Sequence, residues 1–238
     1  MRFGAASLSM TGPRKINEDT VDVWSPKPDC LYAAVADGLG GMGGGSHASQ
    51  LAIQLLKQYL VGESPSEEMM ISFARAIHEN ILGVQNTKPM LKTMATTLTA
   101  ISLVRDQLTG VHCGDTRASL ARGRGIKRLT VDQAEGERLY RAGKLTKDEF
   151  FEYPRKHILD SALGMHKDPQ IEGFSFSIRA GDKIFLTSDG VHQKVLLQEM
   201  REISDRHIDP KVFVEEVGAL IEERKADDNY SIVAIFVS

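Results

Sequence analysis

Residues 31–41 have the sequence Leu-Tyr-Ala-Ala-Val-Ala-Asp-Gly-Leu-Gly-Gly. The apolar run from Leu31 to Ala36 has the length of a strand and is too short for a typical helix, so it predicts a strand buried inside the molecule. Asp37 follows this run directly, and a glycine-rich loop over residues 38–45 comes next. The segment therefore predicts a buried strand that ends on an acidic residue.

Further strands are expected on both sides of this segment, where apolar residues alternate or form short runs. They cover residues 3–10, 20–24, 96–104, 111–122, 171–178, 184–186 and 231–237. Residues 106–110 are expected to form a turn. Because runs of strands stand beside separate helices, the sequence predicts an α+β fold in which antiparallel sheets pack together and helices cover their outer faces.

Helical periodicity appears in several places. Apolar residues recur with a 3.6-residue period over residues 48–59. A second helix is expected to start at Ser64 as the N-cap, with Glu67 closing a capping box. The last helix begins at Pro210. From about Asp132 to Leu163 the composition becomes charged with few β-branched residues, which predicts an insertion of short helices over the sheet.

Composition limits the class of protein. The 238 residues include 29 Lys and Arg against 32 Asp and Glu, a net charge of −3, which argues against a general nucleic-acid binder. No apolar run is long enough for a membrane span or a signal peptide. With two cysteines, Cys30 and Cys113, no disulfide framework is possible, so we expect a cytoplasmic protein. Without repeats or long linkers, we expect one domain over residues 1–238.

Acidic residues recur where apolar strands stop. Asp37, Asp115 and Asp189 each follow a strand-like run, and Asp228 precedes the last strand. An Asp-Gly pair taken alone is typical of a simple turn. If the strands are neighbours, however, the carboxylates meet, and a bound divalent cation relieves their repulsion. Oxygen ligands suit Mg²⁺ or Mn²⁺ rather than Zn²⁺, and a pair of such ions can ionise a water for attack on phosphorus.

Other polar residues extend this pattern near the N-terminus. Glu18 and Asp19 open the second predicted strand, and Arg14 lies shortly before them. A guanidinium group binds phosphate oxygens bidentately, although a loop arginine is more often a solvated surface group. Gly38 has no Cβ, so its carbonyl can turn towards a metal. The glycines over residues 40–45 fit a flexible loop equally well, and no P-loop motif is present.

Seven short motifs occur in order along the whole chain. They are Arg14-x-x-Asn17-Glu18-Asp19, residues 35–41, Thr96-Thr97-Leu98, Gly114-Asp115-Thr116-Arg117, Leu129-Thr130-x-Asp132, Thr187-Ser188-Asp189-Gly190 and Asp228-Asn229. In this order they resemble the motifs of the metal-dependent serine/threonine protein phosphatases, the protein phosphatase 2C or PPM type in its short bacterial form. The resemblance implies a four-layer α-β-β-α sandwich, with a flap near the active site formed by residues 132–163.

The resemblance also implies a metal centre with two Mn²⁺ or Mg²⁺ ions. Asp37 would bridge both ions. Asp189 and Asp228 would complete the site of the first ion. The carbonyl of Gly38 and the carboxylate of Glu18 would serve the second ion.

The remaining implied roles concern water and phosphate. Asp19 would hold a metal-bound water, and Asp115 would help to bind a third, weaker ion. Arg14 would bind the phosphate of the substrate. A metal-activated hydroxide would attack phosphorus in line, with Arg14, Asp37 and Asp19 as the catalytic residues, and no phosphoenzyme would form.

Some positions depart from the pattern of that family. Met42 stands where relatives often carry histidine, and Leu39 follows Asp-Gly where the animal enzymes carry a histidine proposed as general acid. Tyr153 replaces the histidine of a His-Pro pair in the flap. No implied metal ligand is lost, but the acid that protonates the leaving group stays unassigned. His157 in the flap is a candidate, whereas His192 is expected to be a surface residue.

The resemblance implies an enzyme that removes phosphate from phosphoserine and phosphothreonine in proteins. Its partners would be the phosphorylated protein and the serine/threonine kinase that it opposes, with no nucleic acid and no membrane, and we expect a monomer. One alternative is a pseudophosphatase that only binds, although the intact set of Asp37, Asp189 and Asp228 argues against it. Another is a hydrolase of small phosphate esters, because the flap rather than the metal site would select the substrate.

Overall fold

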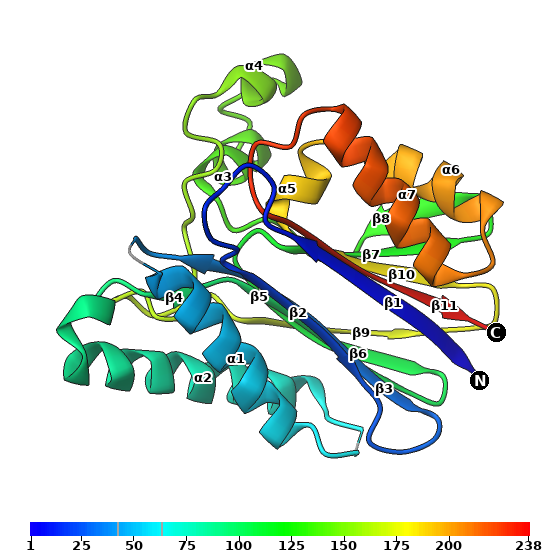
Figure 1. Ribbon diagram of the computed structural model, residues 1–238, viewed down its shortest axis with the longest axis horizontal. Coiled ribbons are helices and arrows are strands. Elements are labelled where there is room, and N and C mark those ends of the chain that lie inside the picture. The colour runs from blue at the N-terminus through cyan, green and yellow to red at the C-terminus, as the bar shows by residue number, and fades with distance from the viewer. Residues whose placement is uncertain (42, 63) are drawn as a thin grey trace.

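Two β-sheets stacked between two groups of helices make up the computed structural model, which describes residues 1–41, 43–62 and 64–238 (Figure 1). Met42, singled out in the glycine-rich loop, lies outside the described residues. The first sheet contains, in spatial order, β1 (Phe3–Met10), β11 (Tyr230–Val237), β10 (Lys183–Thr187), β7 (Arg117–Arg122) and β8 (Gly125–Arg128). All its strand pairs are antiparallel.

The second sheet is also antiparallel. In spatial order it contains β2 (Asp19–Trp24), β3 (Cys30–Leu39), β5 (Leu98–Val104), β6 (Gln107–Cys113) and β9 (Glu172–Ser177), with the short β4 (Ala95–Thr96) paired to β3. The long helices α1 (Gly44–Tyr59) and α2 (Glu67–Thr87) cover its outer face, and a 3₁₀ turn follows at Pro89–Leu91.

The opposite face of the molecule carries the C-terminal helices. They are α5 (Asp189–His192), α6 (Leu197–Arg206) and α7 (Pro210–Glu223), which pack on the first sheet. Pro210 occupies the first turn of α7, as expected from its fixed φ and missing N–H. The predicted α+β fold, a four-layer α-β-β-α sandwich, is therefore confirmed.

Three apolar clusters hold the layers together. Leu56 and Ile77 belong to the cluster between the second sheet and its helices, and Phe213 belongs to the cluster between the first sheet and its helices. The third cluster lies between the two sheets and includes Ile101 and Leu186. Because the central strands are buried on both faces, β3, β10 and β11 contain continuous apolar runs, whereas the edge strands β8 and β9 alternate between exposed and less exposed residues.

The predicted turn at residues 106–110 is wrong. The hairpin between β5 and β6 turns at Arg105 and Asp106, and β6 already starts at Gln107. Arg105 has a φ of 56°, so the tight turn uses a left-handed residue that no glycine marks. Gly110 lies within β6 instead. A glycine is needed at this position because a Cβ there would stand 2.3 Å from the ring of Phe174.

The single strand predicted over residues 111–122 is also wrong. β6 ends at Cys113 in the second sheet, and β7 starts at Arg117 in the first sheet. The chain crosses between the sheets at Gly114, whose φ of 109° suits glycine. This crossing places the next residue, Asp115, between the two sheets.

The second helix starts two residues later than expected from the sequence. The N-cap is Ser66, not Ser64, and its hydroxyl accepts a hydrogen bond from the backbone N–H of Met69 at 3.2 Å. Two serines near one proline offer alternative caps, and the spacing of the apolar face decides between them.

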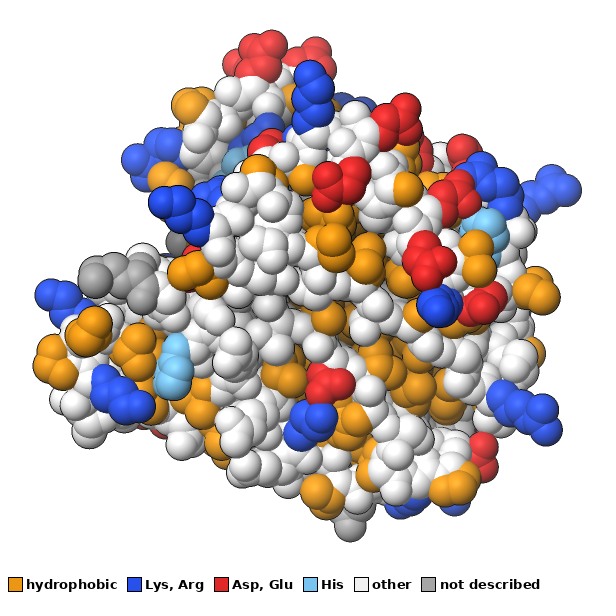
Figure 2. All heavy atoms as spheres, in the orientation of Figure 1, with side chains coloured by type: hydrophobic (Ala, Val, Ile, Leu, Met, Phe, Trp, Pro, Cys, Tyr) orange, Lys and Arg blue, Asp and Glu red, His pale blue; other side chains and the backbone are white. Residues whose placement is uncertain are grey.

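The inserted segment forms the flap, at the top of Figure 1. It contains two short helices, α3 (Glu135–Arg141) and α4 (Lys147–Glu152), as expected from its composition. Leu163 at its end exchanges two backbone hydrogen bonds with Thr96 of β4, at 2.9 and 2.8 Å. Figure 2 shows that charged side chains of both signs are scattered over the visible face of the molecule.

No helix among the described residues is long and apolar enough to cross a membrane. The most apolar segments are instead the strands of the two sheets, whose side chains form the cores described above.

Leu186 tests the packing between the sheets. It is fully buried, so Leu186→Ala should lower the free energy of unfolding by about 2–5 kcal/mol, through lost burial and a remaining cavity. The same substitution at Leu196, which is 63% exposed, should change it by less than about 0.5 kcal/mol. Urea unfolding measures both values. Equal losses at the two positions would contradict this packing.

Candidate metal centre

Acidic residues from both sheets gather at one end of the sandwich. Asp19 and Asp37 lie directly opposite each other on β2 and β3. Asp189 is the first residue of α5, immediately after β10, and Asp228 lies just before β11. Asp115 sits in the crossing between β6 and β7. The structure therefore brings together the five aspartates that the sequence singled out.

The electrostatics of Asp37 show how closely these groups face one another. Burial raises the pKa of Asp37 well above its usual range, and the charges of the other four aspartates raise it further. Burial, followed by the charges of Asp228 and Asp19, raises the pKa of Asp189 to about 7. Burial also raises the pKa of Asp19 to about 6, although the hydrogen bond from Ser188 opposes this shift. Asp115 shows the same direction, mainly through burial and the charge of Asp189.

The backbone of Asp37 is fixed from both sides. Its N–H donates to the hydroxyl of Thr97 at 2.9 Å, and its carbonyl accepts from the backbone N–H of Thr97 at 2.9 Å. The hydroxyl of Thr96 donates to the same carbonyl at 3.0 Å. β3 therefore continues past Asp37 to Leu39 instead of ending there, and the carboxylate projects from a strand rather than from a mobile turn.

Glu18 lies against the start of helix α1. Its carboxylate accepts hydrogen bonds from the backbone N–H groups of Gly45 and Ser46, which lower its pKa, although burial makes the net shift upward. A Cβ on Gly38 would stand 2.1 Å from the carbonyl oxygen of Gly45, so both positions require glycine. Sequence reasoning missed this contact, for which the glycine-rich run was the only signal.

Arg14 is held near the centre by an ion pair. Its Nη2 atom lies 2.7 Å from Oδ2 of Asp228, at a partly exposed position. Asn229 supports this arrangement, because its Nδ2 donates to the carbonyls of Thr11 and Ile16 while its Oδ1 accepts from the N–H of Glu18. Asn229 thus connects the segment that carries Arg14 to the start of β2.

The donor set fits a hard divalent cation. Within the described residues no three acidic, histidine or cysteine side chains already form a group that could hold a metal ion as they stand. The raised pKa values of Asp37 and Asp189 show that a cation here would remove an unfavourable interaction. All the available donors are oxygens, which suits Mn²⁺ or Mg²⁺.

Comparisons with known proteins agree with this arrangement. The family model described as protein phosphatase 2C matches residues 13–224. The chain belongs to the protein phosphatase 2C family. The serine/threonine phosphatase Stp of Listeria monocytogenes is 30% identical over 196 residues, which cover 80% of this chain and 78% of that protein. The family and the enzyme class expected from the seven motifs are therefore confirmed.

Solved structures extend the comparison to the fold and the metal. The serine/threonine phosphatase of S. agalactiae has a TM-score of 0.92 at 22% identity, covers 100% of both chains and shows the same fold. The catalytic domain of the serine/threonine phosphatase PstP has a TM-score of 0.85 at 29% identity and covers 99% of this chain and 98% of that one. That domain is in complex with two manganese ions, which confirms the expected type of cofactor for the family.

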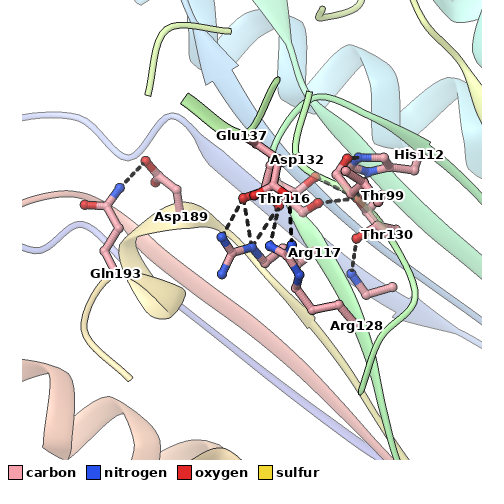
Figure 3. Close-up of polar contacts among 12 residues, drawn as sticks. Thr99, His112, Thr116, Arg117, Arg128, Thr130, Asp132, Glu137, Asp189 and Gln193 are labelled. Atoms are coloured by element: carbon pink, nitrogen blue, oxygen red, sulfur yellow. Dashed lines mark hydrogen bonds and ion pairs between the residues drawn. The ribbon is translucent and has the colours of Figure 1, made fainter. Parts of the chain in front are cut away.

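In this phosphatase 2C family member, Asp189 has a partner on its own helix. The Nε2 atom of Gln193 donates to Oδ2 of Asp189 at 2.7 Å (Figure 3). Since α5 is a single turn, this contact orients the carboxylate relative to the helix. The four-residue spacing is the geometric signal, but no motif of the sequence indicated it.

Ion pairs between arginine and acidic side chains hold the first residues of the flap beside the candidate centre (Figure 3). Arg117 donates to both carboxylate oxygens of Asp132, with Nε at 2.9 and 3.1 Å, and Arg128 bridges Asp132 and Glu137 of α3 at 3.3 Å each. Burial alone would raise the pKa of Asp132, but the hydrogen bonds and charge of Arg117 lower it to about 2. In the sequence, Asp132 was identified only as part of the motif Leu129-Thr130-x-Asp132. The structure shows that its ionised carboxylate anchors the flap.

His192 and His157, the two histidines near the motifs, lie in different environments in the structure. His192 was expected on the surface, which is wrong, because its Nδ1 atom is buried and burial lowers its pKa well below the usual range. It packs near Arg117 and Asp132, where a helix of one turn has little exposed surface. His157 is exposed, and partial desolvation followed by the charge of Lys156 lowers its pKa.

Asp189→Asn tests the repulsion without bound metal. Asp189 ionises near 3.8 in the unfolded chain but at about 7 in the folded protein, so its ionisation destabilises the fold above pH 7 and ceases to do so as pH falls. In EDTA at pH 8, the variant should be more stable than the wild type by at least about 1 kcal/mol. This advantage should shrink towards pH 5.

Urea unfolding between pH 5 and pH 8 measures the difference in free energy of unfolding between the wild type and Asp189→Asn. Both proteins contain the same histidines, so the effect of histidine titration cancels in this difference. Asp168→Asn, at an exposed position, is the matched control and should show no such pH-dependent difference. If Asp189→Asn is less stable than the wild type at pH 8 in EDTA, repulsion between the carboxylates is not the dominant interaction.

Proposed function

We propose that residues 1–238 form one catalytic domain that hydrolyses phosphoserine and phosphothreonine in proteins at a centre of two Mn²⁺ or Mg²⁺ ions. The observation that carries this proposal is the convergence of five aspartates from both sheets around Asp37, beside an arginine. Carboxylates that raise one another's pKa need a cation, and an arginine beside them can bind the anionic substrate.

The ligand roles follow from where each group lies. Asp37, held in β3 by Thr97, would bridge the ions. Asp189 and Asp228 come from the first sheet and would hold one ion. The carbonyl of Gly38 would serve the other ion, together with Glu18. Asp115, buried in the crossing between the sheets, would hold a third, weaker ion.

Glu18 differs from the other proposed ligands in one respect. Two backbone N–H groups at the start of α1 already bind its carboxylate, and negative charge is favourable at the N-terminus of a helix. Its place is therefore fixed by the protein. We infer that Glu18 contributes to the second ion from this fixed position, where the N-terminus of the helix offsets part of the cost of burying its charge.

The reaction proposed here is direct attack of water on phosphorus. The bound ions would lower the pKa of water and neutralise the charge of the phosphoryl group. Asp19, whose carboxylate is buried at the centre, would accept a hydrogen bond from the attacking water and orient it. The guanidinium of Arg14 would bind the phosphoryl oxygens. A new bond from the water oxygen to phosphorus would form while the bond to the serine or threonine oxygen breaks. The attacking water gives up one proton and the leaving oxygen takes up one, so no net proton is consumed in forming the alcohol.

The cellular role proposed here is to oppose a serine/threonine kinase in a signalling pathway of the bacterial cytoplasm. The partners would then be the phosphorylated protein and its kinase, and the phosphatase would act as a monomer without nucleic acid or membrane. The support is the similarity to serine/threonine phosphatases such as Stp of Listeria monocytogenes.

Asp37→Asn tests the metal centre. With Mn²⁺ and a phosphothreonine peptide, kcat should fall by about 10²-fold or more, because one carboxylate oxygen can no longer bridge the ions. EDTA should abolish wild-type turnover. The matched control is Asp22→Asn on β2, where only a surface ion pair with Lys57 is lost, and its kcat should stay within about twofold.

Parallel assays separate the alternatives. A small aryl phosphate hydrolysed with much higher kcat/KM than the peptide would favour a hydrolase of small esters. Calorimetry that detects bound Mn²⁺ without any turnover would identify a pseudophosphatase. Wild-type activity that survives in EDTA would contradict the proposed mechanism.

Arg14→Ala tests phosphate binding. The loss of a charge-assisted, bidentate contact should raise KM for the phosphopeptide by about 10-fold or more. Arg14→Lys should recover only part of this effect, since an ammonium group cannot bind two oxygens in a fork. Steady-state kinetics at saturating Mn²⁺ measure both variants. An unchanged KM in Arg14→Ala would remove Arg14 from the binding site.

A further inference from the structure

A closed ring of hydrogen bonds connects the two sheets beside the candidate metal centre. The hydroxyl of Ser188 donates to Oδ2 of Asp19 at 2.7 Å and accepts from the backbone N–H of Ser231 at 2.9 Å. The hydroxyl of Ser231 donates to Ser9 at 2.9 Å, and Asn17 also donates to Ser9 at 2.9 Å. The ring closes where the N–H of Asp19 donates to Oδ1 of Asn17 at 3.1 Å.

The ring joins elements from both sheets. Ser9 and Ser231 face each other on β1 and β11 of the first sheet, while Asp19 begins β2 of the second. Ser188 connects β10 to α5, one residue before Asp189. The ring therefore links β1, β11 and the end of β10 in the first sheet to the start of β2 in the second, independently of the apolar packing.

Ser188 is the member that touches a proposed catalytic group. Its side chain is fully buried, and Asp19 is 7% exposed. Although Ser188 stands at the N-cap of α5, its hydroxyl makes no capping hydrogen bond to that helix. The hydroxyl is committed to Asp19 and Ser231 instead. Because one hydrogen bond to it comes from a backbone N–H, the donor direction towards Asp19 is set by the protein.

We propose that Ser188 is a positioning residue that orients the carboxylate of Asp19 towards the reacting water, and that the ring through Ser231, Ser9 and Asn17 holds Ser188 in place. This proposal rests on the proposed function of the same site. Partners that orient a ligand or a catalytic carboxylate from behind change metal affinity or activity by about 10–100-fold when they are removed. Asp19, Ser188 and Ser231 are the buried members of the ring, and hydrogen bonds between buried groups hold them rigidly.

The ring further connects Asp19 with the segment that carries Arg14. Asn17 lies between these two residues in the chain. Its side-chain amide nitrogen donates to Ser9 and its side-chain amide oxygen accepts from the N–H of Asp19, so both polar atoms belong to the ring. A disturbance of Asp19 through Ser188 should therefore affect turnover more than binding of the phosphopeptide, because the contact of Arg14 with phosphate does not pass through Ser188.

Ser188→Ala is the principal test. It should lower kcat for the phosphothreonine peptide by about 10–100-fold and weaken Mn²⁺ binding in calorimetry by about 10-fold. KM for the peptide should stay within about twofold. The matched control is Ser204→Ala in α6, which removes an equally buried serine hydroxyl that donates to the carbonyl of Arg201. Its kcat and Mn²⁺ affinity should equal those of the wild type even if its melting temperature falls as much.

Ser9→Ala is a second variant that leaves the contact between Ser188 and Asp19 in place and opens the ring elsewhere. It should reduce kcat in the same direction but by a smaller factor than Ser188→Ala. It also keeps the proposal testable if Ser188→Ala fails to fold. An unchanged kcat and Mn²⁺ affinity in Ser9→Ala would overturn the role of the ring.

The outcomes distinguish this proposal from the proposed function. If kcat and Mn²⁺ affinity of Ser188→Ala stay within about twofold of the wild type, or if Ser204→Ala matches its losses, the positioning role is wrong. If the wild type shows no Mn²⁺-dependent turnover, the proposed function fails. Calorimetry still decides the positioning role in that case, because only Ser188→Ala and Ser9→Ala should then bind Mn²⁺ more weakly.

Discussion

Five aspartates from two sheets face one another around Asp37, and their mutual repulsion is the constraint on which the rest of the structure depends. Burial makes the charges of Asp19, Asp37, Asp115 and Asp189 costly, and the neighbouring charges increase that cost. The protein keeps these groups together by fixing them to rigid elements, as the two threonines before β5 do for the backbone of Asp37. A fold that tolerates such repulsion without metal gains stability when a divalent cation binds, so ligand binding and stability are linked.

The sandwich architecture explains why the site lies between the sheets. Strands of the first sheet deliver Asp189 and Asp228, and strands of the second deliver Asp19 and Asp37. The apolar cluster between the sheets sets their spacing, and the hydroxyl ring through Ser188 links their ends. The relative positions of the acidic side chains therefore depend on how firmly the two sheets pack against each other.

The flap is tied to this centre more firmly than its charged composition implies. Its first residues are anchored by Arg117 and Arg128 through Asp132, and its last residues pair with β4 through Leu163. Between these anchors the short helices α3 and α4 stand apart from the sheets (Figure 1). Both ends of the flap are therefore fixed, the first through Asp132 and the second through Thr96 of β4.

The sequence by itself determined the α+β class, the layer order and the identity of the acidic residues, because apolar runs and their acidic ends are local patterns. It could not place the turn at Arg105, since a left-handed residue other than glycine leaves no local signal. Nor could it show that the chain crosses between sheets at Gly114, that the Nδ1 atom of His192 is buried, or that Ser188 binds Asp19. These features join residues far apart in the chain, and only the packing of one sheet on the other decides them.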